Sequence, residues 1–185
     1  MKPSPLTFHS SPAAGFDEPF EMLLACHERV QRMLRLLLRL AEHLPVHGAD
    51  DQARQAARDV MRYFDQAGPA HHEDEERHLF PLLQAQGDAG LAALVQRLQQ
   101  DHVAMGTQWQ AVRADLADIE AGRWPPAQPA ALLPRWQAYA ALYAAHIAAE
   151  EGRAYPAARP LLPGPALQAI GEEMAQRRGV YLPHA

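Results

Sequence analysis

Four histidines and two glutamates in this sequence form two copies of one pattern. In each copy a histidine is followed 44 residues later by a second histidine, and a glutamate follows four positions after that. The second copy lies 75 positions beyond the first (27 to 102, 71 to 146, 75 to 150), and the six residues are His27, His71, Glu75, His102, His146 and Glu150. Imidazole nitrogens and carboxylate oxygens are suitable ligands for iron, manganese and zinc. The repeat therefore predicts two equivalent ligand groups that together enclose two metal ions.

The sequence around the ligands is repeated as well. The two stretches read His71-x3-Glu75-Glu76-x3-Phe80-Pro81 and His146-x3-Glu150-Glu151-x3-Tyr155-Pro156. A histidine and a glutamate four residues apart on a helix project from one face, with Cβ atoms about 5–6 Å apart, so both side chains can reach one metal ion. Two imidazoles for each ion, with both carboxylates bridging, would hold two ions about 3.5–4 Å apart.

Two polar features beside the ligands allow more than one interpretation. His72 and Glu76 are also four residues apart and could replace His71 in an alternative pairing, although the aromatic–proline pairs after both motifs favour the register on His71. His78 lies seven residues after His71, and its repeat equivalent is Arg153. This pair is interpreted either as hydrogen-bonded or partly exposed, or as an additional contact to an anion or metal.

The remaining side chains near the ligands are assigned to a pocket, the core or the surface. A pocket beside the metals is expected to be lined by Met105, Trp109 and Tyr143, and the alternative for these three residues is a position in the core. The core is also the expected place of Phe64 and Tyr139. Tyr143 is one turn before His146 and its repeat equivalent is Gly68, so the pocket should be asymmetric, with a phenol available to a metal-bound ligand. A solvated acidic face that attracts cations is expected for Glu73, Asp74, Glu76 and Glu151.

Helices separated by connections rich in proline and glycine are expected to position these residues. Alanine, leucine, glutamine and arginine dominate the long segments, and extended β-branched runs are absent, which predicts a nearly all-helical chain. The expected helices cover residues 17–44, 50–86, 88–121, 129–154 and 165–178. Asp17 is the expected N-cap of the first helix, and Pro45, Pro125-Pro126 and Pro156 are expected to follow helix ends. A kink or restart is expected at Gly68-Pro69.

Four long helices with short polar connections predict one fold class. We expect an all-α, up-down-up-down antiparallel four-helix bundle with a pseudo-two-fold internal repeat and a short C-terminal helix. The predicted organisation is an irregular N-terminal arm at residues 1–16, the bundle at residues 17–156, and a C-terminal extension with a short helix at residues 157–185. The chain of 185 residues is long enough for one well-buried domain.

Composition excludes several classes of function. The net charge is −5 and lysine or arginine blocks are absent, which argues against nucleic-acid partners. The single cysteine, Cys26, excludes an intramolecular disulfide and a cysteine-rich zinc or iron–sulfur site within one chain. No apolar run approaches the ~20 residues that span a bilayer, and no targeting segment is evident, so a cytoplasmic location without membrane partners is expected. Apolar surface residues leave a homodimer possible.

The two copies of the histidine–glutamate pattern resemble the hemerythrin-like, or HHE cation-binding, domain family. The resemblance covers about residues 17–156 and rests on the six repeated histidines and glutamates with their flanking aromatic–proline pairs. It implies a four-helix bundle that holds a non-haem di-iron centre with an oxo or hydroxo bridge. By this resemblance the four histidines are terminal ligands, and Glu75 and Glu150 bridge the ions. Manganese and zinc are possible substitutes for iron.

The resemblance also narrows the expected function. Oxygen-carrying members use five histidines with a glutamate and an aspartate, whereas the set here is closer to that of bacterial proteins proposed to repair iron–sulfur centres. Those proteins carry a cysteine-containing N-terminal domain that this sequence lacks. We therefore expect a stand-alone di-iron protein that binds or senses dioxygen, nitric oxide or peroxide. The alternatives are a di-iron oxidase or peroxidase, iron storage or donation, and a structural metal site; whether the chain is an enzyme stays open.

Overall fold

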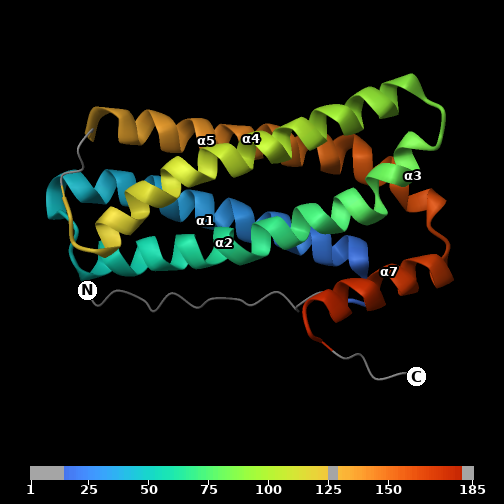
Figure 1. Cartoon of the computed structure of the whole chain (residues 1–185), viewed down its shortest axis with the longest axis horizontal. Coiled ribbons are helices and arrows are strands. Elements are labelled where there is room, and N and C mark those ends of the chain that lie inside the picture. The colour runs from blue at the N-terminus through green and yellow to red at the C-terminus, as the bar shows by residue number, and fades with distance from the viewer. Residues whose placement is uncertain (1–14, 125–128, 181–185) are drawn as a thin grey trace, which may run out of the picture.

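Four long helices lie side by side in the structure (Figure 1), and they are α1 (Pro19–His47), α2 (Asp51–His78), α4 (Ala89–Glu120) and α5 (Pro129–Ala149). The computed structural model describes residues 15–124 and 129–180, and this part of the chain is helical without a strand. The prediction of an all-α chain is confirmed for these residues. The predicted arm at residues 1–16 lies almost wholly outside the described part, as do Pro125 and Pro126. Among the described helices, none is long and apolar enough to cross a membrane.

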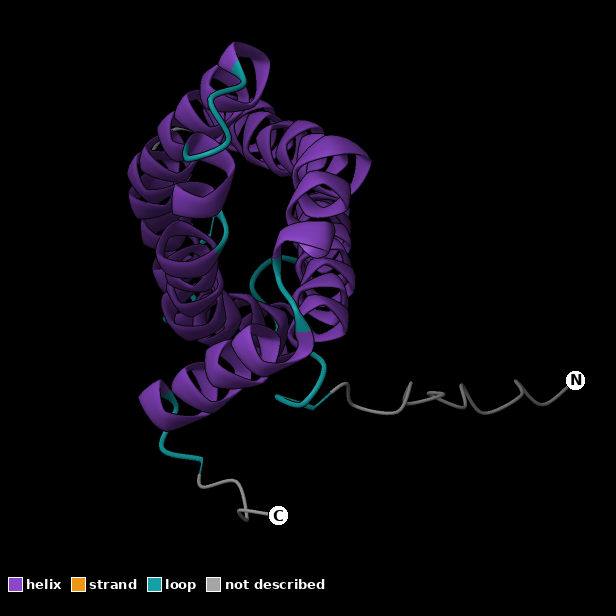
Figure 2. Ribbon diagram, turned by 90° about the vertical axis from the view of Figure 1, so that its right-hand side faces the viewer, coloured by secondary structure: helices purple, strands orange, loops and turns teal. Residues whose placement is uncertain are grey.

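Each long helix packs against two others. α1 contacts α2 and α5, and α4 contacts the same two helices. The end-on view in Figure 2 shows the four helices arranged as a ring. Side chains that point to the inside of this ring are removed from water, so residues that are distant in sequence can meet there.

Two clusters of buried apolar side chains fill the ring and leave a layer between them. In α1 one cluster ends at Leu23 and the other begins at Val30. Along α2 the cluster that contains Val30 ends at Phe64, and the cluster that contains Leu23 resumes beyond this helix at Leu79. The predicted ligands of α1 and α2 occupy the interval between these clusters. A polar layer enclosed by apolar packing on both sides is therefore built into the core.

Two aspartates cap helices as their positions suggest. Asp50 Oδ1 accepts a hydrogen bond from the backbone N–H of Ala53 at 2.8 Å, and Asp88 Oδ1 accepts one from Leu91 at 2.9 Å. These bonds satisfy N–H groups that have no partner within the first turn of a helix. The predicted starts of the second and third helices are therefore confirmed.

Both predicted boundaries of the first helix are wrong by a few residues. Asp17 does not cap α1, because Glu18 is the residue before the helix and no side chain caps its first turn. Pro45 does not end α1, which continues to His47 and ends at Gly48 with a φ of 66°. Proline removes one backbone hydrogen bond from a helix, but here it lies in the last turn. The positive φ of Gly48, which glycine adopts without strain, ends the helix instead.

The expected restart at Gly68-Pro69 is also wrong, because α2 runs unbroken to His78. Pro69 is exposed, whereas Gly68 is buried. An added Cβ at Gly68 would lie 3.8 Å from the hydroxyl of Tyr143, so this glycine brings α2 and α5 close together. The helix is interrupted instead at Leu79, after which α3 covers Phe80–Gln84.

The fourth predicted helix changes its winding at the second motif. The α-helix stops at Ala149, and a π-helical turn, η1, covers Glu150–Ala154. Pro156 does not end this helix but lies in the first turn of α6 (Tyr155–Ala158), which the 3-10 turn η2 (Arg159–Leu161) follows. The spacing of apolar residues in the sequence does not reveal a π-helical turn, because the turn adds one residue without changing the direction of the helix.

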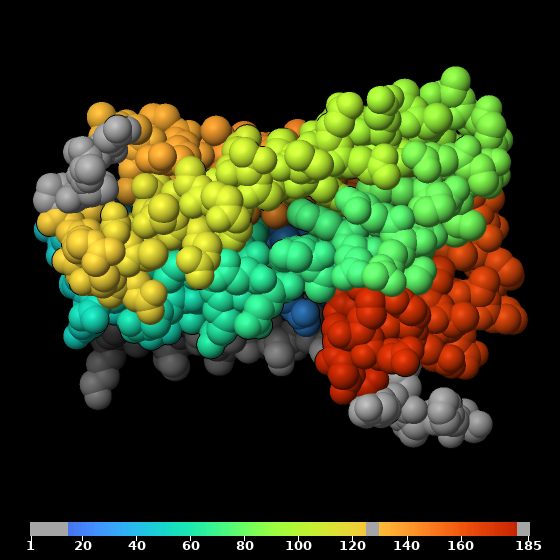
Figure 3. Space-filling view, in the orientation of Figure 1, coloured from blue at the N-terminus to red at the C-terminus, as the bar shows by residue number. Residues whose placement is uncertain are grey.

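The expected fifth helix is present as α7 (Gly164–Arg177), packed beside α1 and α2. Figure 3 shows it in red against the green surface of α2. Arg178 Nη2 donates to Asp74 Oδ2 at 2.6 Å, and Arg177 donates to the same carboxylate. An added Cβ at Gly171 would lie 1.8 Å from the carbonyl oxygen of Phe16, so this close approach requires glycine. Asp74 is thus a buried anchor rather than part of the solvated face that was expected.

The apolar cluster around Leu37 should supply much of the stability. Leu37 is 0% exposed, whereas Leu133 is 42% exposed. We predict that Leu37→Ala lowers the free energy of unfolding by about 2–5 kcal/mol, because it leaves a cavity in the core. The matched change Leu133→Ala should cost about 0.5 kcal/mol or less. Urea unfolding followed by circular dichroism measures both, and equal losses would contradict the assignment of the core.

Candidate metal centre

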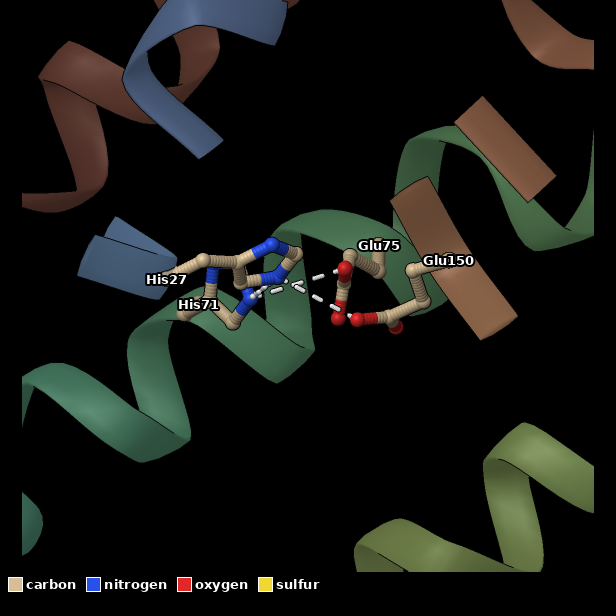
Figure 4. A group of neighbouring side chains, drawn as sticks. All are labelled: His27, His71, Glu75 and Glu150. Atoms are coloured by element: carbon tan, nitrogen blue, oxygen red, sulfur yellow. Dashed lines mark hydrogen bonds and ion pairs between the residues drawn. The ribbon is translucent and has the colours of Figure 1, made fainter. Parts of the chain in front are cut away.

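All six predicted ligand residues meet inside the ring, and every one of their side chains is buried. His27 comes from α1, His102 from α4 and His146 from α5, while α2 supplies His71 and Glu75. The sixth, Glu150, is the first residue of η1. Figure 4 shows four of them, from three helical segments, with the imidazoles of α1 and α2 facing two carboxylates.

The six side chains form two overlapping groups that share both glutamates. Within each group the possible donor atoms all lie within 4.8 Å of one another, and the groups are His27, His71, Glu75 and Glu150, and His102, His146, Glu75 and Glu150. Each group therefore contains two imidazoles and two carboxylates. Such a set can hold one metal ion in each group.

The imidazole pairs have matching geometry. The Nε2 atoms of His27 and His71 are 3.1 Å apart, and those of His102 and His146 are also 3.1 Å apart. Two imidazole nitrogens that face each other can share only one proton between them, whereas a cation can accept both lone pairs. The spacing of each pair is therefore suited to binding one ion.

Each glutamate directs one oxygen toward each imidazole pair. Glu75 Oε1 lies 3.5 Å from His71 Nε2, and Glu75 Oε2 lies 3.5 Å from His102 Nε2. Glu150 Oε1 lies 2.8 Å from His146 Nε2, and Glu150 Oε2 lies 3.2 Å from His27 Nε2. This is the orientation that a bridging carboxylate requires.

Outer carboxylates orient three of the four imidazoles. Glu151 lies 2.8 Å from His27 Nδ1, and Glu76 lies 2.7 Å from His102 Nδ1. A carboxylate that accepts the Nδ1–H of a neutral imidazole leaves the lone pair on Nε2, which here faces the centre of the site. Glu76 and Glu151 are exposed to solvent, as expected, but the sequence did not reveal their contacts with the ligand histidines. Their own separation of 75 positions was the signal that links them to the repeat.

The other two imidazoles differ in this outer contact. Asp101 Oδ2 lies 3.3 Å from His146 Nδ1, a contact that the sequence analysis missed. The residue 75 positions before Asp101 is Cys26, and His71 Nδ1 is buried without a hydrogen-bond partner. Asp101 could have been found by asking which acidic residues adjoin a ligand histidine, since it directly precedes His102.

Buried oxygen atoms at the centre have no hydrogen-bond partner. Glu75 Oε2 and both carboxylate oxygens of Glu150 are in this state, although imidazole nitrogens lie within ion-pair distance. Burying carboxylates without compensation is costly in free energy. Cations bound between the glutamates would satisfy these oxygens, so the donor set fits a metal centre.

Protons can balance part of this charge in the metal-free protein. Burial lowers the pKa of His27 and of His102, but the close contacts and negative charges of the neighbouring glutamates raise each pKa above its usual value. Burial alone dominates for His71 and lowers its pKa to about 4. Burial raises the pKa of Glu150, but the imidazoles of His146 and His27 lower it further, to about 2. The carboxylate of Glu150 is therefore ionised and available to a cation.

The polar residues with open interpretations lie outside the two groups. The ring of His72 stacks on His102 with centroids 3.9 Å apart, and no donor group among the described residues includes it. His78 Nε2 lies 2.7 Å from a carboxylate oxygen of Glu173 on α7, which agrees with the hydrogen-bonded interpretation. Arg153, its repeat equivalent, is exposed.

The three expected pocket residues are buried beside the ligand layer. Met105, Trp109 and Tyr143 all belong to the larger apolar cluster. Trp109 Nε1 donates to Asp65 Oδ1 at 3.0 Å, and burial raises the pKa of Tyr143 to about 12. Their packing agrees with a core position, and their contact with a bound ligand stays a prediction.

Tyr155 was used in the sequence analysis only to establish the register of the repeat. Its side chain is buried, and its hydroxyl donates to Glu75 Oε1 and lies 3.1 Å from His27 Nε2. The hydroxyl thus reaches atoms of two of the predicted ligands. The replacement of Phe80 by a tyrosine in the second copy was the available signal.

Comparison with known proteins agrees with this geometry. Residues 18–158 match the family described as the hemerythrin HHE cation binding domain. An uncharacterized protein of Haemophilus influenzae is 32% identical over 106 residues, which make up 57% of this chain. The matched region spans 61% of the length of that relative.

We expect divalent metal ions to stabilise the fold through these residues. Ligand that binds only the folded state at 100 times its Kd adds about 2.7 kcal/mol of stability. Ferrous iron or cobalt, added without oxygen to metal-free protein, should raise Tm, and His27→Ala should remove most of this rise. His43→Ala is the control, because His43 belongs to a separate surface group with His47 and Asp50. An equal rise in Tm for His27→Ala and the wild-type chain would contradict the central site.

The outer carboxylates should tune metal affinity. We predict that Glu76→Gln weakens cobalt binding by about 10–100-fold, because His102 loses the ionised acceptor that orients it. Glu73→Gln should leave affinity unchanged, since Glu73 pairs with Arg77 and Arg177 at the surface. Titration with cobalt followed by visible absorption measures both Kd values. An unchanged Kd in Glu76→Gln would show that this contact is not needed.

Proposed function

The chain belongs to the hemerythrin HHE cation-binding family, and from this membership we propose that it is a non-haem di-iron protein that binds or senses a small ligand. The ligand class is dioxygen, nitric oxide or peroxide. The proposed metal ligands are His27, His71, Glu75, His102, His146 and Glu150.

One observation carries the proposal, namely that the two donor groups share both glutamates. Each group offers two imidazoles and one oxygen from each carboxylate, so the protein would supply four donors to each of two ions. Metal ions that prefer octahedral surroundings would retain positions for a small ligand or a bridging oxygen. A saturated structural site would leave no such position.

The donor atoms are compatible with iron. Nitrogen and oxygen donors suit iron, manganese and zinc, and the thiol of Cys26 belongs to neither group. Bound iron would supply a change of oxidation state and an open coordination position. The chain itself would hold three of the four imidazoles in the required tautomer through Glu76, Glu151 and Asp101. Apolar packing on both sides of the ligand layer would exclude water.

We also infer that the four long helices form an up-down-up-down antiparallel bundle made of two equivalent halves. The closed order of helix contacts supports this topology. The equal Nε2 distances in the two imidazole pairs, and the equivalent Nδ1 contacts of Glu151 and Glu76, support the equivalence of the halves. A bundle with pseudo-two-fold symmetry would place the two ions as equivalent neighbours at its centre.

Iron loading followed by exposure to small ligands tests the proposed function. We expect about two iron ions per chain and a stoichiometric change of the ultraviolet–visible spectrum with nitric oxide or peroxide. His102→Ala should lose iron and the spectral response, whereas His43→Ala should retain both. Catalytic consumption of peroxide would instead identify a di-iron peroxidase, and transfer of iron to an apo-cluster protein would identify a donor. Tightly bound zinc without any spectral response would contradict the proposal.

A further inference from the structure

A phenol oxygen lies among the proposed ligands of one metal position. The hydroxyl of Tyr155 is 3.1 Å from His27 Nε2 and donates a hydrogen bond to Glu75 Oε1. Both partners belong to the group formed with His71 and Glu150. Tyr155 is itself buried, so no solvent competes for the hydroxyl. Five donor side chains therefore meet on this side of the site.

The other metal position lacks this oxygen. Phe80 stands 75 positions before Tyr155 in the sequence. Tyr155 stacks on His27 with centroids 5.4 Å apart and planes at 11°, and Phe80 stacks on His102 with centroids 5.6 Å apart and planes at 24°. The rings thus occupy equivalent places, and the hydroxyl is the chemical difference between them.

The π-helical turn explains how Tyr155 reaches the ligand layer. Residues five apart in an α-helix point in directions that differ by about 140°, since each residue turns the chain by about 100°. In a π-helix the backbone bond joins residues five apart, which places them above one another. The backbone N–H of Tyr155 bonds the carbonyl oxygen of Glu150 in this way. The turn therefore brings the phenol to the same side as Glu150.

The contacts of the hydroxyl place its oxygen beside the atoms that would bind a cation. In this structure Glu75 Oε1 accepts the phenol hydrogen, and His27 Nε2 lies beside the hydroxyl. A cation bound by these two atoms would use the Nε2 lone pair of His27 and one lone pair of Glu75 Oε1, and the phenol oxygen lies beside both atoms. The phenol oxygen is therefore positioned to coordinate the same cation.

We propose that Tyr155 is a fifth protein ligand of the metal ion held by His27 and His71, bound through its phenolate oxygen. The inference rests on the proposed di-iron function and deepens it. The phenol proton leaves to solvent when the metal–oxygen bond forms, as protons do when ligands bind metals. The two ions then differ in coordination, and the ion held by His102 and His146 retains the open position for a small ligand.

Resonance Raman spectroscopy of the iron-loaded full chain tests the ligand role. Ferric iron bound to a phenolate has a visible charge-transfer band and enhanced tyrosinate ring modes. Both should be present in the wild-type protein and lost in Tyr155→Phe, while the iron content stays at about two per chain. The control is Tyr143→Phe, which changes another buried tyrosine and should retain the modes.

The same samples separate the two proposals. Iron-loaded wild-type protein without tyrosinate modes, or modes that survive in Tyr155→Phe, would overturn the ligand role and leave the di-iron function standing. Absence of bound iron in the wild-type chain would overturn both. If Tyr155→Phe fails to hold iron, the other four tyrosines are changed one at a time to phenylalanine (Tyr63, Tyr139, Tyr143 and Tyr181). Retention of the modes in all four variants assigns them to Tyr155, and loss in any one of them contradicts that assignment.

A reciprocal change tests where the open position lies. Phe80→Tyr places a hydroxyl on the ring that stacks on His102. Azide, used as a small anionic probe of the iron-loaded protein, should bind the wild-type chain and Tyr155→Phe but should lose binding in Phe80→Tyr. Unchanged azide binding in Phe80→Tyr would overturn the assignment of the open position.

Discussion

Two carboxylates buried among four imidazoles impose the constraint on which the rest of the structure depends. Glu75 and Glu150 have no exposure to solvent, and three of their four oxygens lack a hydrogen-bond partner. Apolar clusters on both sides prevent water from compensating these charges. A fold that keeps such a layer in its centre requires positive charge there, either as protons on imidazoles or as metal ions. Binding of metal ions would use every Nε2 lone pair and both oxygens of each glutamate.

The sequence predicts which six side chains meet inside the bundle better than it predicts the helix ends. Spacing along a helix determines which side chains share a face, so His71 and Glu75 could be paired from their positions alone. Pro45 and Pro69 were misleading, because tertiary packing tolerates a proline that local rules treat as a stop. The π-helical turn at Glu150 and the break at Leu79 depend on backbone bonding that no residue pattern specifies. The outer contacts of Glu76 and Glu151 required three-dimensional proximity, although their positions repeat.

The differences between the two copies of the pattern carry functional information. Asp101 contacts His146, but its repeat equivalent in the sequence is Cys26, and the Nδ1 atom of His71 has no hydrogen-bond partner. Tyr155 brings a hydroxyl to one side, and Phe80 does not on the other. Equivalent ligands would hold the two ions in the same way, so these surrounding residues are what can make one ion reactive and the other structural. Reactivity at a single ion of a pair suits the binding of one small molecule.

X-ray absorption spectroscopy at the iron edge of the loaded protein tests the shared-glutamate centre most directly. If both carboxylates bridge two ions, the spectrum will show nitrogen and oxygen neighbours only and an iron–iron distance of roughly 3.5–4 Å or slightly less. Iron without a second metal neighbour, or with a sulfur neighbour, would contradict a centre built from these six residues.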